Sequence, residues 1–234
     1  MEEKNTVRFK KEEFAIRERI KQEIGKGKVS KVKIEYAPIG ERIILSTSKP
    51  GLIIGRGGEK IAELTETVRK NFKLENPHIE IDEIKNPDFD AQLVADDIAL
   101  GLERFGPLKF KVLAYRALQR IMKAGALGAE IRLTGKIPSS RAKSWRFAQG
   151  YLKKTGDSAN AVDRAKSRAT TKPGVVGIKV SILTPTAILK DRIKVDDKLI
   201  EKLKKNSEKT EKEEKKTKTK KSKKEKVENA EEKE

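Results

Sequence analysis

The chain contains no cysteine, one histidine and one tryptophan among its 234 residues. Without cysteine it can form neither a disulfide framework nor a cysteine-based zinc site, and it has no thiol chemistry. Metal binding through His78 would require several carboxylates beside it, and the sequence groups none there. We therefore expect no metal site and no cofactor, and we expect His78 to lie at the surface or at a strand edge.

Long apolar segments are also missing. No stretch approaches the length of a transmembrane span, and the first residues, Met1 to Lys4, lack the apolar core of a signal peptide. These absences predict a soluble, cytoplasmic protein that has no membrane partner.

Patterns typical of catalysis are scarce as well. The pairs Asp82–Glu83, Asp96–Asp97 and Asp196–Asp197 are sequence neighbours, whose side chains point apart on a helix or a strand. Serine, histidine and aspartate form no constellation for nucleophilic chemistry, because the single histidine would have to serve every such scheme. The sequence therefore favours a binding protein over an enzyme, and we expect no small-molecule substrate.

Positive charge is what the chain has in excess. Its 55 lysines and arginines outnumber 36 acidic residues, which gives a formal net charge of +19. Such an excess predicts a polyanionic partner, either nucleic acid or an anionic membrane. The cations are spread along the whole folded region, and no cationic helix carries a broad face of tryptophan, leucine and phenylalanine. Nucleic acid is therefore the favoured partner.

A glycine loop is the first candidate site. Gly55, Arg56, Gly57 and Gly58 form a GXXG sequence that opens into an amphipathic helix, with Lys60 in its first turn. Glycine lets the backbone approach a ligand closely, and the amides at a helix N-terminus favour phosphate. A KH module holds about four nucleotides of single-stranded backbone in this way. These five residues are the RNA-binding residues expected in this loop.

GXXG alone is a weak signal, but the sequence excludes two other glycine motifs. No Gly-Lys-Ser/Thr follows the loop, which excludes a nucleotide-binding P-loop. No strand leads directly into glycines with G-x-G-x-x-G spacing, which excludes a dinucleotide-binding turn.

Apolar periodicity places the loop in an order of helices and strands. The expected elements are a helix ending near residue 24, strands at 32–36 and 42–47, a short helix at 50–54, a helix from 58 and a strand at 79–81. This α-β-β-α-GXXG-α-β order is that of a type II KH domain, which we assign to residues 1–86.

A second unit of two helices and an antiparallel sheet is expected at residues 87–190. Its first helix has two apolar faces, which predicts that it packs between layers. The residues of these faces are Val94, Ile98, Leu102 and Phe105 on one and Phe89, Leu93 and Leu100 on the other. A helix to about 124 and strands at 131–133, 141–152, 162–170 and 176–182 follow. The fold class is therefore α+β.

The second helix of this unit carries a cationic stripe. Lys109, Arg116, Arg120 and Lys123 recur at helical spacing, while the apolar residues lie on the other side. A cationic stripe of this kind is usually only a solvated surface. However, residues 109–129 contain no acid, and unpaired like charges cost stability, so a polyanion is a plausible partner.

A second basic cluster spans residues 141–172, with nine cations and two aspartates. Its candidate RNA-binding residues are Arg141, Lys143, Arg146, Lys153, Arg164, Lys166 and Arg168. On an extended strand Arg146 points away from the face of Trp145, Phe147 and Tyr151. Aromatics beside cations can stack on bases, but we assign these three to the core and the cations to RNA.

The last segment, 191–234, is interpreted as a disordered tail. Residues 201–234 contain 14 lysines and 10 glutamates, with no aromatic residue. Such a tract cannot bury enough apolar surface to offset the entropy of ordering. A weak electrostatic tether to RNA is the functional alternative.

Four blocks in order resemble a known family. They are Lys49-Pro-Gly-Leu-Ile-Ile-Gly-Arg-Gly-Gly-Glu, Leu93-Val-Ala-Asp-Asp-Ile with Leu102-Glu-Arg, Gly125-Ala-Leu-Gly-Ala-Glu-Ile-Arg-Leu-Thr-Gly-Lys, and Gly174-Val-Val-Gly-Ile-Lys-Val. Over nearly all of residues 1–190 the chain resembles the small-subunit ribosomal protein S-three family in its archaeal form.

The resemblance implies a structural constituent of the head of the small ribosomal subunit, located in the cytoplasm. Its implied partners are small-subunit rRNA, mRNA near the channel by which mRNA enters, and neighbouring ribosomal proteins. In bacterial relatives basic residues at the start of the second helix are associated with mRNA unwinding. Here Lys111 and Arg116 are basic, but Val112 and Tyr115 are not, which argues against a direct transfer of that role.

Two alternative functions remain open at this point. Eukaryotic relatives have been linked to cleavage at abasic DNA sites, where a lysine amine would be the nucleophile. No lysine of this chain stands out as desolvated. A free-standing KH regulator of mRNA would instead prefer short single-stranded motifs.

Overall fold

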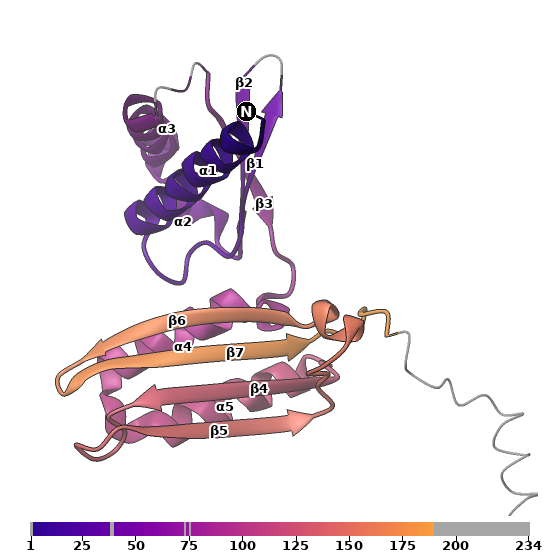
Figure 1. Ribbon diagram of the computed structural model, residues 1–234. Coiled ribbons are helices and arrows are strands. Elements are labelled where there is room, and N and C mark those ends of the chain that lie inside the picture. Colours follow the sequence, from indigo (N-terminus) through magenta and orange to yellow (C-terminus); the bar gives the residue numbers. More distant parts are fainter. Residues whose placement is uncertain (1, 38–39, 73, 75, 190–234) are drawn as a thin grey trace, which may run out of the picture. The chain divides into compact units, whose positions relative to one another are not determined.

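The computed structural model describes residues 2–37, 40–72, 74 and 76–189 (Figure 1). The predicted tail at 191–234 lies outside these residues. Within the described residues, no helix has the length and apolar character needed to cross a membrane.

The first part of the chain contains three helices and a three-stranded sheet. Its elements are α1 (Glu2–Ile24), β1 (Val32–Ala37), β2 (Gly40–Thr47), α2 (Pro50–Ile54), the 3-10 turn η1 (Arg56–Gly58), α3 (Glu59–Phe72) and β3 (His78–Glu83). The sheet order is β1-β2-β3, with β1 antiparallel and β3 parallel to β2. This confirms the predicted α-β-β-α-GXXG-α-β order. His78 begins the edge strand β3 with its side chain exposed, as predicted.

The core of this part lies between the helices and the sheet. Ile16 and Ile20 of α1 are buried against Ile43 and Leu45 of β2 and Val68 of α3. Burying side chains of this size typically contributes about 1.5–3 kcal/mol each. Helix α1 extends well before the apolar stripe that predicted it.

The second part is a two-layer arrangement of helices and sheet. Its elements are η2 (Pro87–Phe89), α4 (Ala91–Phe105), η3 (Pro107–Lys109), α5 (Phe110–Lys123), β4 (Gly128–Gly135), β5 (Lys143–Gly150), η4 (Asp157–Ala161), β6 (Asp163–Thr171) and β7 (Gly174–Leu183). The strand order is β5-β4-β7-β6, and every neighbouring pair is antiparallel. The predicted α+β class is confirmed.

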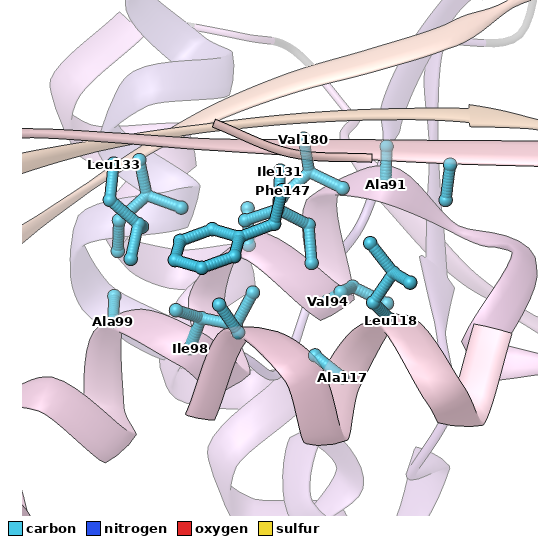
Figure 2. Packing of buried hydrophobic residues seen from close by; sticks show 14 of the residues in the cluster. Ala91, Val94, Ile98, Ala99, Ala117, Leu118, Ile131, Leu133, Phe147 and Val180 are labelled. Carbon is cyan, nitrogen blue, oxygen red and sulfur yellow. The ribbon is translucent and has the colours of Figure 1, made fainter. Parts of the chain in front are cut away.

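Helices α4 and α5 cover one face of this sheet, and the hydrophobic core fills the space between the helices and the sheet (Figure 2). Ile98 of α4 and Leu118 of α5 pack there with Ile131, Phe147 and Val180 of the sheet. Helix α4 begins where the Asp90 side chain accepts hydrogen bonds from the amides of Gln92 and Leu93, as an N-cap residue does.

Three details of the predicted helix faces were wrong. Phe89 lies in the 3-10 turn before α4 and not on the helix. Phe105, the last residue of α4, is 51% exposed. Leu100 is also exposed.

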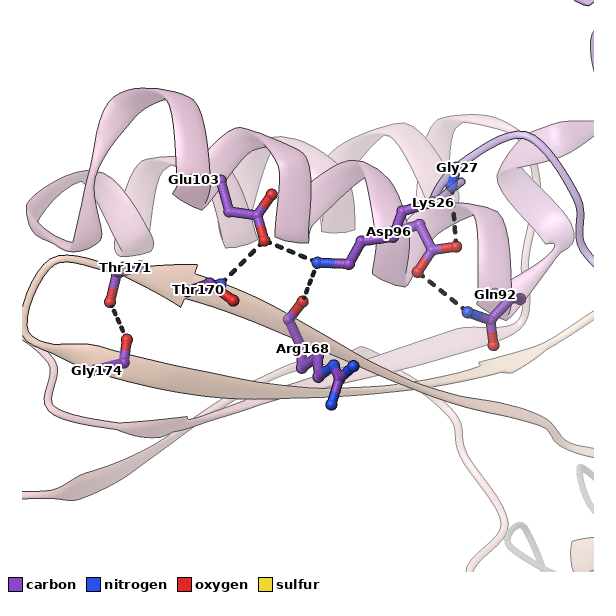
Figure 3. Close-up of polar contacts among 9 residues, drawn as sticks. All are labelled: Lys26, Gly27, Gln92, Asp96, Glu103, Arg168, Thr170, Thr171 and Gly174. Atoms are coloured by element: carbon purple, nitrogen blue, oxygen red, sulfur yellow. Dashed lines mark hydrogen bonds and ion pairs between the residues drawn. The ribbon is translucent and has the colours of Figure 1, made fainter. Parts of the chain in front are cut away.

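Polar contacts join the loop after α1 to α4 and β6 (Figure 3). Lys26 Nζ lies 2.8 Å from Glu103 Oε1 and donates to the Arg168 carbonyl at 3.0 Å. The same carboxylate oxygen accepts the Thr170 amide at 2.9 Å. The Lys26 hydrogen bond, with that from Thr170, lowers the pKa of Glu103. The Gly27 amide donates to Asp96 Oδ2 at 3.1 Å.

Candidate nucleic-acid interface

The glycine loop stands at the junction of α2 and α3, with Gly57 exposed and Gly55 and Gly58 half-buried. Gly55, Gly57 and Gly58 all have positive φ, at 75°, 61° and 84°. A Cβ on Gly55 would lie 2.8 Å from Cγ of Lys60, whereas one on Gly57 or Gly58 would meet nothing within 4 Å. Gly55 is therefore required by the turn itself, and the two later glycines leave open space in front of the backbone.

Two cations flank this open backbone. Arg56 lies in the loop and Lys60 in the first turn of α3, and both are exposed. Neither forms an ion pair with any other described residue. The N-terminus of a 14-residue helix next to two unpaired cations makes a suitable site for phosphate groups.

Arg116, Arg120 and Lys123 of the predicted stripe are exposed on α5, whereas Lys109 lies in the 3-10 turn before the helix. Of these three, Arg120 is neutralised by acidic side chains. Arg120 Nη2 lies 2.6 Å from Asp97 Oδ2, and its Nε lies 3.8 Å from Asp88. These acids come from η2 and α4. Although residues 109–129 contain no acid, Arg120 is therefore paired with acids from other elements. Arg116 and Lys123 are exposed and form no ion pair within the described part of the chain.

Two lysines near the start of α5 lie over aromatic rings. Lys109 Nζ is 5.4 Å from the centre of the Phe105 ring, and Lys111 Nζ is 5.0 Å from that of Trp145. Such cation–π contacts hold the ammonium groups near the surface, where they remain exposed.

Four cations of β5 and β6 lie on the face of the sheet that points away from the helices. Trp145 and Phe147 turn toward the helices, where both rings pack against Phe110. Arg146 points to the opposite face, as predicted, where it donates a hydrogen bond to Glu130 and forms an ion pair with it. Strand alternation places three residues of β6 on that same face, namely Arg164, Lys166 and Arg168.

The core assignment of the three aromatics was right for Phe147, which is buried, and for Trp145, which packs against the core. It was wrong for Tyr151, which follows β5 and is 54% exposed. Arg141 and Lys143 are exposed near the start of β5, and Lys153 is half-buried after its end.

Sequence reasoning missed two cations on this face of the sheet, which points away from the helices. Arg132 of β4 and Lys179 of β7 are directly opposite each other in the strand pairing. Both are exposed. The alternation of charged and apolar residues in each strand was visible, but the pairing of β4 with β7 was not.

Within the described residues, no group of three or more histidine or acidic side chains is placed to hold a metal ion.

Comparison with known proteins identifies both parts of the chain. The model of the KH domain family matches residues 15–89, and that of the ribosomal protein S3 C-terminal domain matches residues 98–182. Small ribosomal subunit protein uS3 of Methanocaldococcus jannaschii is 40% identical over 84% of this chain and 94% of its own. The chain belongs to the uS3 family.

Further relatives agree with this assignment. The uS3 protein of Archaeoglobus fulgidus is 39% identical over 88% of this chain and 89% of its own length. That of Methanococcus maripaludis is 36% identical over 84% of this chain and 92% of its own. These relatives confirm the archaeal type expected from the four sequence blocks, and the family is one of structural proteins rather than enzymes.

Proposed function

We propose that the chain is a structural constituent of the small ribosomal subunit in the cytoplasm and binds small-subunit rRNA in the head of the subunit. Its uS3 relatives are named as small ribosomal subunit proteins. The observation that carries the rRNA contact is the open glycine loop, in which the exposed Gly57 and the open space at Gly57 and Gly58 lie between Arg56 and Lys60. We propose residues 1–86 as the KH domain and 87–190 as the C-terminal domain.

The exposed face of α5 is proposed to line the path of mRNA through the subunit. Arg116 and Lys123 supply unpaired positive charge on this face, and Lys109 and Lys111 add charge near its start. Arg120 contributes less, because two carboxylates already neutralise it. Neighbouring ribosomal proteins are further proposed partners.

The test is the location of the native protein in cell extracts. Sucrose-gradient fractions probed with an antibody should place the protein with small subunits. Hydroxyl-radical cleavage of rRNA from a probe tethered at position 57 should cut rRNA near the glycine loop. A protein that sediments only as a free species would contradict the proposal and favour a free-standing KH regulator.

A further inference from the structure

The four-stranded sheet has one uncovered face. Helices α4 and α5 lie on one side of it, and no described helix or strand covers the other (Figure 1). The uncovered face carries the side chains that alternate with the buried ones. Along β7, for example, Val180 and Ile182 are buried, whereas Lys179 is exposed and Ser181 half-buried.

Strand pairing aligns four cations across this face. Arg146 of β5 is opposite Arg132 of β4, Arg132 is opposite Lys179 of β7, and Lys179 is opposite Lys166 of β6. All four side chains are exposed. Because adjacent strands lie about 4.8 Å apart, the row spans roughly 14 Å. Arg164 and Arg168 lie on either side of Lys166 along β6 and widen the charged surface.

Only part of this charge is compensated within the protein. Glu130 lies in the adjacent row, where it is opposite Ala148 and Ser181. It accepts hydrogen bonds from Arg132 and Arg146. Lys166 and Lys179 have no ion pair with any described residue.

Like charges directly opposite each other destabilise a sheet. The β7–β6 half of the row therefore keeps a repulsion that a bound polyanion would remove.

The chemistry of the face favours a particular form of RNA. Its outward positions along the four strands contain no aromatic residue, because Trp145 and Phe147 turn inward. A sheet that binds unpaired bases does so by stacking them on aromatic side chains. A flat surface of lysine and arginine instead suits phosphates. Double-stranded RNA is recognised mainly by its shape, its phosphates and its 2′-hydroxyls.

We propose that this open sheet face, centred on Arg132, Lys179 and Lys166, docks the phosphate backbone of a double-stranded RNA segment without regard to its sequence. The proposal rests on the rRNA-binding function above and adds a site for paired RNA to the glycine loop for unpaired RNA. The α5 stripe lies on the opposite layer of the same domain, with the hydrophobic core between them. The domain can therefore hold two RNA segments at once.

The test compares two full-length variants with the wild-type protein. Lys166→Gln with Lys179→Gln removes two uncompensated charges from the face. Lys4→Gln with Lys11→Gln removes two exposed charges from α1, which likewise form no ion pair within the described residues. Binding of a 20-base-pair RNA duplex and of a 20-nucleotide single strand is measured across a series of salt concentrations.

We expect the sheet variant to bind the duplex several-fold more weakly. Its log–log salt slope should fall in magnitude by about 1.8, which corresponds to two lost phosphate contacts. Single-strand binding should stay near wild type, and the control variant should match wild type on both probes. The unfolding midpoint of the sheet variant should be unchanged or higher, because an unfavourable pair of charges is removed.

Two results would overturn the proposal. Unchanged duplex binding would mean that this face does not dock RNA, and an equal loss on both probes would mean that it is not selective for paired RNA. Neither result bears on the rRNA-binding function, which is judged from the sedimentation of the wild-type protein and from its single-strand binding.

Discussion

Arg146 Nε lies 3.0 Å from Oε1 of Glu130, on the open face of the four-stranded sheet. Lys154 Nζ lies 2.8 Å from the other carboxylate oxygen. Burial alone would raise the pKa of Glu130, but the hydrogen bonds from Arg146 and Lys154 outweigh it and lower the pKa to about 2. This nearly buried carboxylate is the internal counter-charge of a basic surface.

The stability contributed by Glu130 should depend on pH. Its folded-state pKa is depressed from 4.5 to about 2, so the contribution is complete above about pH 5 and is lost as the pH falls toward 2. The shift corresponds to roughly 3 kcal/mol at most, and less because its partners are half exposed. Urea unfolding of wild type and Glu130→Gln should differ by about 2 kcal/mol at pH 7 and by clearly less at pH 3.

The matched control for this measurement is Glu66→Gln. Glu66 also pairs with a lysine, Lys70, and that pair lowers its pKa, but both side chains are exposed on α3. Solvent screens such a pair, so its removal should change stability little at either pH. A stability difference for Glu130→Gln that stays constant from pH 7 to pH 3 would mean that its effect is one of packing and not of charge.

The glycine loop predicts a charge effect on RNA binding. Arg56→Asp, alone or with Gly57→Asp, should weaken single-strand binding at low salt by roughly tenfold, because the new carboxylates repel phosphate. Gly57 has a φ of 61°, which aspartate tolerates better than most residues, and its Cβ would meet no atom within 4 Å. Thermal unfolding should therefore change little.

Arg69→Asp supplies the comparison for this prediction. Arg69 is exposed near the end of the same helix and forms no ion pair with other described residues, so the change in charge is equal but distant from the loop. Equal losses for Arg56→Asp and Arg69→Asp would indicate a diffuse field of the whole protein and no clamp at the loop.

Two glycines separated by one turn of α2 should respond differently to alanine. Gly55→Ala places a Cβ 2.8 Å from Lys60 and at a φ of 75° with a ψ of −172°, a region that essentially only glycine adopts, so we expect a loss of about 1–3 kcal/mol in stability. Gly51→Ala adds a Cβ to a helical position with open space around it, and should be neutral or stabilise by up to about 1 kcal/mol. Thermal unfolding followed by circular dichroism measures both, and equal effects would contradict the role assigned to Gly55.

The α5 stripe should separate into functional and structural cations. Arg116→Glu with Lys123→Glu should reduce initiation on structured mRNA several-fold, with little effect on stability, because neither side chain is paired. Arg120→Glu should lower stability by about 1 kcal/mol or more, since it would face Asp97 and Asp88 with like charge.

Subunit assembly and initiation rates in a reconstituted system measure the first variant, and thermal unfolding measures the second. If the Arg116 and Lys123 variant fails mainly in assembly, these residues hold rRNA or a neighbouring protein and do not face mRNA.

The sequence was sufficient for the order of elements, because local apolar periods mark each helix and strand. It was less informative at the start of α1, where few apolar residues are buried. There the helix is supported by ion pairs about one turn apart, such as Arg8 with Glu12 and Lys10 with Glu13. The helical stripe ending at Ile24 gave no sign of this extension to Glu2.

The candidate site was predictable only where it is local. The loop at Gly55–Gly58 is continuous in sequence and was found directly. The partners of Arg120 come from residues 88 and 97, and the opposition of Arg132 and Lys179 depends on strand register. Both relationships arise from tertiary structure, so counting charges along the chain could not reveal them.

The two hydrophobic clusters share no residue, and the chain's single tryptophan, Trp145, packs against only the later one. Its indole fluorescence is therefore a local reporter. It reports the unfolding of the sheet and helices of the C-terminal half, and it does not report the unfolding of the half that contains the glycine loop. If the unfolding midpoints from fluorescence and from far-ultraviolet circular dichroism differ, the two halves unfold at different temperatures.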